Sequence, residues 1–138
     1  MKHEIKLNCE KSRLVDLRAF LNKILAKTTL TEITKNQVIL AVDEVCSNLI
    51  IHSHDCNPQE QIALEVTDSG DQLVFEIKDH GEGFNILEYQ QPELKAVKKE
   101  RRKGGLGIML VRKIMDGIEF ESSGNQNTCR LIKHINSK

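Results

Sequence analysis

The chain has 138 residues, the usual length of one domain with a single hydrophobic core. Its 20 Lys and Arg residues balance 20 Asp and Glu residues, so it lacks the basic excess that is normal in nucleic-acid-binding proteins. No apolar run is long enough to span a bilayer and the N-terminus lacks the apolar core of a signal peptide. We therefore expect a cytoplasmic protein that binds neither nucleic acid nor membrane.

The first half of the chain predicts one strand and two helices. Apolar and polar residues alternate over 5–9, which indicates a strand with one buried face. Helical spacing of apolar residues then predicts a helix over 12–27, with Ser12 as its N-cap, and a longer helix over 31–54 that begins at Thr31.

The second half predicts two hairpins and a third helix. Alternation over 62–66 and 73–77 around a Ser-Gly-Asp turn indicates the first hairpin. A helix is expected over 106–115, with Gly117 as its C-cap, followed by a closing hairpin over 118–135.

These elements predict a single domain over residues 1–138. Most neighbouring strands are joined by tight turns, so the sheet should be mixed and largely antiparallel. With the helices on one face, the expected architecture is a two-layer α/β sandwich.

Glu44 and Asn48 are one helical turn apart and therefore share a helix face. The Asn48 amide oxygen is a hard ligand suited to Mg²⁺, and a carboxylate such as Glu44 beside a magnesium-bound triphosphate can deprotonate an attacking hydroxyl. The structural alternatives are an Asn that satisfies a backbone group and a solvated helix acid. Asp43 is the nearest competing acid, about 100° around the helix.

The segment Asp79-His80-Gly81-Glu82-Gly83 follows a predicted strand. Its acid can accept a hydrogen bond from the exocyclic amine of adenine, and Gly81 and Gly83 permit close approach of the backbone. The alternative is an ordinary strand-ending turn.

The segment Gly104-Gly105-Leu106-Gly107 precedes the third predicted helix. It is typical of a phosphate cradle at a helix N-terminus, and the alternative is a glycine hinge. Just before it, 95–103 holds six basic residues and one acidic residue. We expect residues 85–103 to form a lid that attracts a nucleotide; a solvated charge run is the alternative.

The cysteines are scattered with no C-x-x-C pair, so reduced thiols in the core are the favoured interpretation. A metal cluster near the end of the second helix is a weaker alternative, because His-x-His is common without a metal. The residues concerned are Cys9, Cys46, Cys56 and Cys129, and for the cluster His52, His54, Asp55 and Cys56.

In chain order, the E-x-x-x-N motif followed by His52, the D-x-G-x-G-F box and the G-G-L-G-I box resemble the GHKL (Bergerat-fold) ATPases. Among these, the chain is most similar to the small anti-sigma-factor serine kinases. The resemblance implies the same fold, ATP and Mg²⁺ as cofactors, Glu44 as the general base and Asn48 as the metal ligand. It also implies nucleotide contacts from Asn48, His52, Asp79, Gly81, Gly83, Gly104, Gly105, Leu106, Gly107 and Thr128.

Two positions depart from the family pattern. Thr128 matches the threonine of a late G-T pair, but Asn127 replaces the glycine. Asn85-Ile86 replaces the Asp-Pro that often follows the Phe, which affects the local loop and not the fold.

The resemblance implies an ATP- and Mg²⁺-dependent serine/threonine-protein kinase that phosphorylates an anti-anti-sigma protein of the STAS class, sequesters a sigma factor and forms a homodimer. The alternative is a nucleotide-gated binding module of the same fold that transfers no phosphate, and the intact Glu44 favours the kinase. A histidine-kinase fragment is disfavoured, because no dimerisation helix with a phosphoacceptor His precedes the domain.

Overall fold

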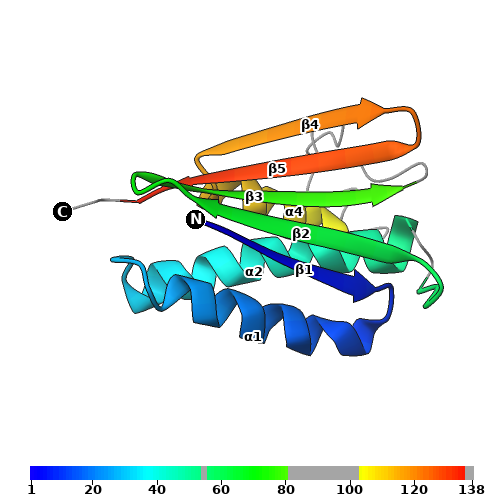
Figure 1. Cartoon of the computed structure of the whole chain (residues 1–138), viewed down its shortest axis with the longest axis horizontal. Helices are drawn as coiled ribbons and strands as arrows, with labels where there is room; N and C mark the ends of the chain where they lie inside the picture. The colour runs from blue at the N-terminus through cyan, green and yellow to red at the C-terminus, as the bar shows by residue number, and fades with distance from the viewer. Residues whose placement is uncertain (54–55, 81–102, 136–138) are drawn as a thin grey trace.

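In the computed structural model, residues 1–53, 56–80 and 103–135 are described, and they form a five-stranded sheet with helices along one face (Figure 1). The strands are β1 (Lys2–Asn8), β2 (Gln61–Asp68), β3 (Gln72–His80), β4 (Gly117–Ser123) and β5 (Gln126–His134). The helices are α1 (Leu14–Leu25), α2 (Glu32–Asn48) and α4 (Lys103–Ile114), with a short 3-10 helix η1 (Lys11–Arg13) and a π-helix η2 (Leu49–Ser53). The predicted two-layer α/β sandwich is confirmed.

The sheet has the order β1-β2-β3-β5-β4, and each of these neighbouring pairs is antiparallel. Both predicted hairpins are present, and their turns contain Gly70 (φ 96°) and Gly124 (φ 61°), in a conformation that favours glycine. The prediction of a mixed sheet allowed parallel pairs, but none joins the described strands.

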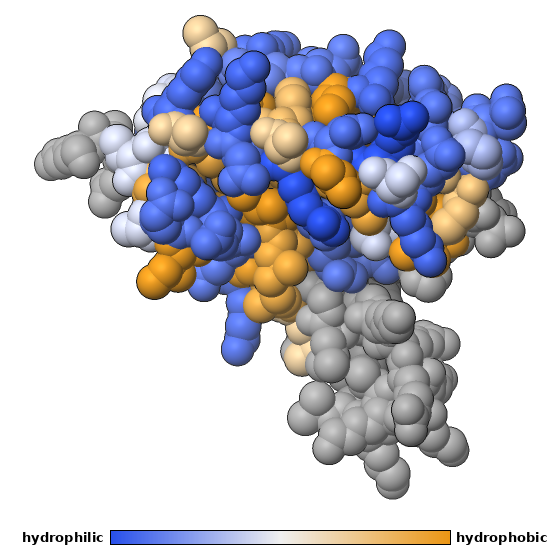
Figure 2. Space-filling view, turned by 90° about the horizontal axis from the view of Figure 1, so that it is seen from below, coloured by the Kyte–Doolittle hydropathy of each residue, from blue (hydrophilic) through white to orange (hydrophobic). Residues whose placement is uncertain are grey.

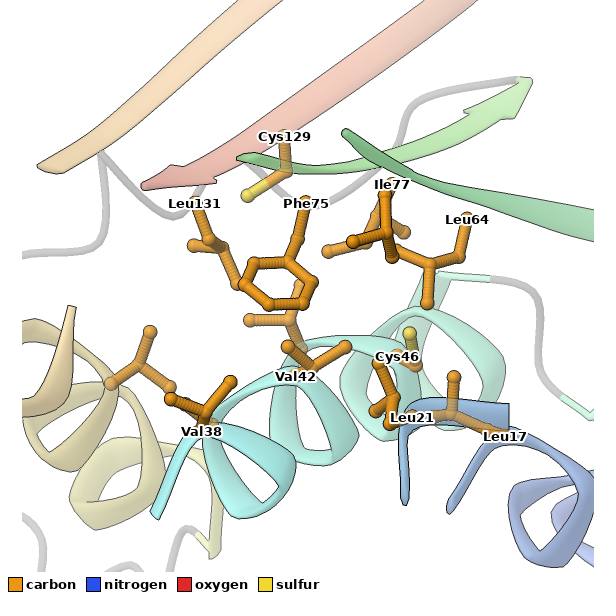
Figure 3. Packing of buried hydrophobic residues seen from close by; sticks show 14 of the residues in the cluster. Leu17, Leu21, Val38, Val42, Cys46, Leu64, Phe75, Ile77, Cys129 and Leu131 are labelled. Carbon is orange, nitrogen blue, oxygen red and sulfur yellow. The ribbon is translucent and has the colours of Figure 1, made fainter. Parts of the chain in front are cut away.

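Alternation along the strands separates a buried face from a polar face. The inner face carries side chains such as Leu64, Phe75 and Leu131, which are fully or almost fully buried. Figure 3 shows Phe75 pointing from β3 toward Val42 of α2, with Leu131 beside it. The core therefore lies between the sheet and the helices, as the alternation predicts.

The opposite side of the helical layer faces away from the sheet, and Figure 2 shows hydrophobic residues exposed there among hydrophilic ones. The exposed apolar residues of these helices are Val15, Ile33, Leu40 and Leu110. No helix in the described part of the chain is long and apolar enough to cross a membrane.

Two predicted helix caps are wrong. Ser12 lies within η1, and α1 begins after Arg13 without a side-chain cap, because a 3-10 turn takes up the start of the helix. Gly117 is the first residue of β4 and has no positive φ, so it is not a C-cap. A Cβ at this position would lie 3.3 Å from Cδ1 of Ile132, a closer approach than most Cβ atoms make. The predicted cap at Thr31 is confirmed by a 3.1 Å hydrogen bond from the Thr34 amide.

The outer face of the sheet carries a charge cluster around Arg130. Its guanidinium donates to Glu76 at 2.9 Å and to Glu119 at 2.7 Å. Burial alone would raise the pKa of Glu76, but the hydrogen bond and charge of Arg130 outweigh it and lower this pKa below its ordinary value. Glu65 lies directly opposite Glu76 in the register, and a side-chain hydrogen bond between the two lowers the pKa of Glu76 further.

Arg130→Met should therefore lower the free energy of unfolding at pH 7 by about 1–2 kcal/mol. The depressed pKa of Glu76 means that its stabilisation is present above the unfolded-state pKa of about 4.3 and is lost as pH falls through the folded-state pKa. The difference in the free energy of unfolding between Arg130→Met and the wild type should therefore become smaller at acidic pH. Urea titrations at several pH values would measure it. Glu119→Gln is the control, because its 56% exposed side chain should matter little; equal stability of Arg130→Met and wild type at pH 7 would contradict the account.

Candidate active site

The Glu44–Asn48 pair lies at the C-terminal end of α2. The Asn48 side chain is 4% exposed, and its Nδ2 donates to the Glu44 carbonyl oxygen at 2.9 Å and to Glu44 Oε2 at 2.7 Å. Asn is unfavourable inside a helix, and these two bonds compensate for its burial. The predicted one-turn spacing therefore produces direct contact between the amide and the carboxylate.

Asp43, the competing acid, is held elsewhere. Arg18 of α1 donates from Nε and a terminal nitrogen to the two Asp43 carboxylate oxygens, at 3.2 and 3.3 Å. This bidentate pair ties α1 to α2. Glu44 accepts from Asn48 alone among the described side chains, so it is the better placed of the two acids to take a proton.

The helix changes its winding directly after Asn48. Residues Leu49–Ser53 form the π-helix η2, where the prediction had a continuous α-helix to about His54. His52 belongs to η2, but its side chain lies outside the described part of the structure, as do His54 and Asp55.

Asp79 lies near the end of β3 on the inner face of the sheet. Asp79 is 2% exposed, and it is the next inward-facing residue of β3 after Phe75 and Ile77. In Figure 1 the end of β3, the C-terminal end of α2 and the start of α4 lie toward the same end of the molecule. Asp79 is therefore a buried acid at the end of the domain where Glu44 and Asn48 also lie.

Asn127, and not Thr128, lies opposite Asp79. The two residues pair in the register between β3 and β5, and Asn127 is 2% exposed. Its Oδ1 accepts from Ser122 Oγ at 3.0 Å. Thr128 points to the outer face, where it lines a cavity of about 290 Å³ with Lys78 and Arg130. The structure therefore does not bring Thr128 together with Asp79, and Asn127 is a site candidate that motif matching missed.

The alternation of inward and outward residues along β5 would have placed Asn127 on the inner face of the sheet. Leu131 and Cys129 are the buried residues of β5, and the next inner-face position along this strand is Asn127. Counting back by two from the apolar residues would have placed Asn127 inside and Thr128 outside.

The charge of Asp79 acts on two buried thiols. Burial first, and then the negative charge of Asp79, raise the pKa of Cys129 to about 12. Burial, Glu60 and Asp79 raise the pKa of Cys9 to about 11. Both thiols are protonated at neutral pH, and all four cysteines are free, which fits the predicted role as small core residues.

The glycine segment is helical. Because α4 begins at Lys103, residues Gly104, Gly105, Leu106 and Gly107 lie in its first turns, and the prediction that the helix begins at Leu106 is wrong by three residues. Packing of α4 against α2 offsets the low helix propensity of glycine. The first four N–H groups of a helix have no acceptor within it, so this end remains suited to an anion. Gly81, Gly83 and residues 85–102 of the predicted lid lie outside the described residues.

The pair on α2 fits a magnesium ion. Both acceptors of Asn48 Nδ2 are oxygens that cannot donate, so Nδ2 faces Glu44 and Oδ1 faces away from it. Within the described part of the chain, this largely buried Oδ1 accepts no hydrogen bond. An unpartnered amide oxygen is a suitable ligand for Mg²⁺, whose remaining positions are commonly filled by water and phosphate.

Comparisons with known proteins show the family of the chain. Residues 7–133 match the family of histidine kinase-like ATPase domains. An anti-sigma F factor of Anoxybacillus flavithermus is 31% identical over 108 residues, which are 78% of this chain and 73% of that protein. An anti-sigma F factor of Clostridium perfringens is 28% identical over 119 residues, 86% of this chain and 82% of that protein.

Two solved structures share the fold. The RsbU and RsbW domains of a Mycobacterium tuberculosis protein superpose with a TM-score of 0.69 at 14% identity, over 98% of this chain and 32% of that chain. The SiaB–SiaC complex of Pseudomonas aeruginosa gives a TM-score of 0.67 at 13% identity, over 94% of this chain and 88% of that chain. The predicted family resemblance is confirmed, and the chain belongs to the histidine kinase-like ATPase domain family as a relative of the anti-sigma F factors.

Proposed function

We propose that this protein is an ATP- and Mg²⁺-dependent serine/threonine-protein kinase that phosphorylates an anti-anti-sigma protein of the STAS class and also sequesters a sigma factor. The observation that carries the proposal is the contact of 2.7 Å between the Glu44 carboxylate and the Asn48 amide, with Asp43 held by Arg18. Membership of an ATPase domain family supports ATP as the nucleotide. The names of the anti-sigma F relatives support the sigma factor and its antagonist as partners.

Each site residue has a proposed task. Asp79 accepts a hydrogen bond from the adenine amine, and Asn127 lies opposite it in the register of β3 and β5. Asn48 Oδ1 holds the metal, which would neutralise charge on the phosphate oxygens. The N-terminal turn of α4, at Gly104, Gly105, Leu106 and Gly107, receives the phosphates, and Glu44 takes the proton of the attacking hydroxyl. His52, Gly81 and Gly83 stay predicted nucleotide contacts.

The proposed setting is the cytoplasm, where free thiols such as those of this chain persist. The homodimer that the resemblance implies also stays a prediction, which sedimentation equilibrium of the purified protein would check.

Labelled ATP, incubated with this protein and the STAS proteins encoded near it, tests the proposal. Transfer of the γ-phosphoryl group to one of them is expected. Nucleotide-dependent binding of a partner without phosphate transfer would instead favour the nucleotide-gated binding module, which has the same fold and nucleotide site.

Asn48→Ala should weaken Mg-ATP binding by about tenfold or more, because it removes the proposed metal ligand. The fold should persist, since Ala is a better helix former than Asn. Calorimetric titration with and without Mg²⁺ measures the effect, and binding of ATP in EDTA is the control that should change little. Unchanged Mg-ATP affinity in a folded variant would reject the metal role of Asn48.

A further inference from the structure

The Asn48 amide has one orientation that satisfies its donors. Its two N–H groups face the Glu44 carbonyl oxygen at 2.9 Å and Glu44 Oε2 at 2.7 Å. Turning the amide over would bring Oδ1 against these two acceptor oxygens, where neither side can donate. Buried polar groups left without a partner are costly, so the turned state is disfavoured.

Of the two acceptors, only the carboxylate depends on the side chain at position 44. The carbonyl oxygen of residue 44 remains in any substitution, and a neutral amide–carbonyl bond is weaker than a bond to an ionised carboxylate. The terminal torsion of Asn is otherwise broad and roughly two-fold. Glu44 Oε2 therefore contributes the greater part of the preference for one orientation.

We infer, on the basis of the proposed magnesium-dependent function, that Glu44 is also a positioning residue that holds the Asn48 amide so that Oδ1 faces the metal. Without an acceptor oxygen on the side chain of residue 44, the amide can turn and present its N–H groups, which repel a cation. Glu44 thus contributes to metal affinity through Asn48, separately from its proposed role as a base.

The test measures how far Mg²⁺ strengthens the binding of ADP, which is not turned over, by calorimetric titration with Mg²⁺ and in EDTA. In Glu44→Ala this enhancement should fall about tenfold. Glu44→Gln should keep more of it, because the Gln Oε1 can still accept from Asn48 Nδ2. Thermal melts of each variant exclude a loss caused by unfolding.

A double-mutant cycle separates positioning from charge. If Glu44 acts through the amide, Glu44→Ala should have less than about a twofold effect in the Asn48→Ala background. If Glu44→Ala reduces the Mg²⁺ enhancement equally in the wild-type and Asn48→Ala backgrounds, the carboxylate acts by its own charge and the inference is overturned. The inference is also overturned if Mg²⁺ strengthens ADP binding equally in Glu44→Ala and the wild type. It is likewise overturned if Mg²⁺ does not strengthen ADP binding in the wild type. Because no phosphate is transferred here, a wild type that shows the enhancement but phosphorylates no partner would reject the kinase and leave the positioning role standing.

Discussion

Replacing Glu44 by Gln is expected to slow phosphoryl transfer by about 10²–10⁴-fold while nucleotide and partner affinities persist. Gln keeps the length of the side chain and can still accept from Asn48 Nδ2, which lies 2.7 Å from Glu44 Oε2 in the wild type. It cannot take a proton from the attacking hydroxyl. Single-turnover phosphorylation of the cognate antagonist by both forms measures the effect.

Asp43→Asn is the matched control, because it removes a carboxylate from the adjacent position of the same helix. Asp43 is paired with Arg18 at 3.2 Å, so its loss should leave the transfer rate near that of the wild type. Equal rates for Glu44→Gln and wild type would reject Glu44 as the base and make Asp43 the first candidate.

Asp79→Asn is expected to weaken ATP and ADP alike by about 10–100-fold. Asp79 is 2% exposed at the end of β3, and its carboxylate only accepts hydrogen bonds when ionised. An amide in its place can present a donor to the adenine amine, which is itself a donor. Titrations with ATP, ADP and GTP measure the loss and the base preference together.

Glu76→Gln is a suitable control, since it changes an acid of the same strand that lies on the outer face and pairs with Arg130. Its nucleotide affinity should equal that of the wild type. If GTP binds the wild type as well as ATP does, or if Asp79→Asn binds both adenine nucleotides normally, the adenine assignment is wrong.

Most of the fold could be predicted because its periodicities are clean. The row Ile62, Leu64 and Val66 is buried as alternation requires, and the glycines at 70 and 124 form the turns between strands. The helix ends were harder, because they depend on tertiary packing. Ser12 has the right chemistry for a cap, but the chain enters α1 through a 3-10 turn, and α4 extends over glycines that local propensity would exclude.

Part of the candidate site could also be predicted, because helix spacing alone places Glu44 and Asn48 in contact. The bond between Arg18 and Asp43 could not be predicted, since it joins two helices whose relative placement no local pattern encodes. Asn127 was missed for a different reason. Motif matching selected Thr128, although the period of two in β5 puts Asn127 on the face that carries Asp79.

The chemical form of the transferred phosphate distinguishes a serine/threonine kinase from a histidine kinase and from a module that only binds nucleotide. The protein would be incubated with labelled ATP, Mg²⁺ and its antagonist, and the labelled antagonist then treated with acid and mapped by mass spectrometry. We expect the wild type to form an acid-stable phosphoester on a Ser or Thr of the antagonist, and Glu44→Gln to form it much more slowly. An acid-labile phosphate on a His, or nucleotide-dependent binding with no phosphate transferred to any STAS partner, would contradict this expectation.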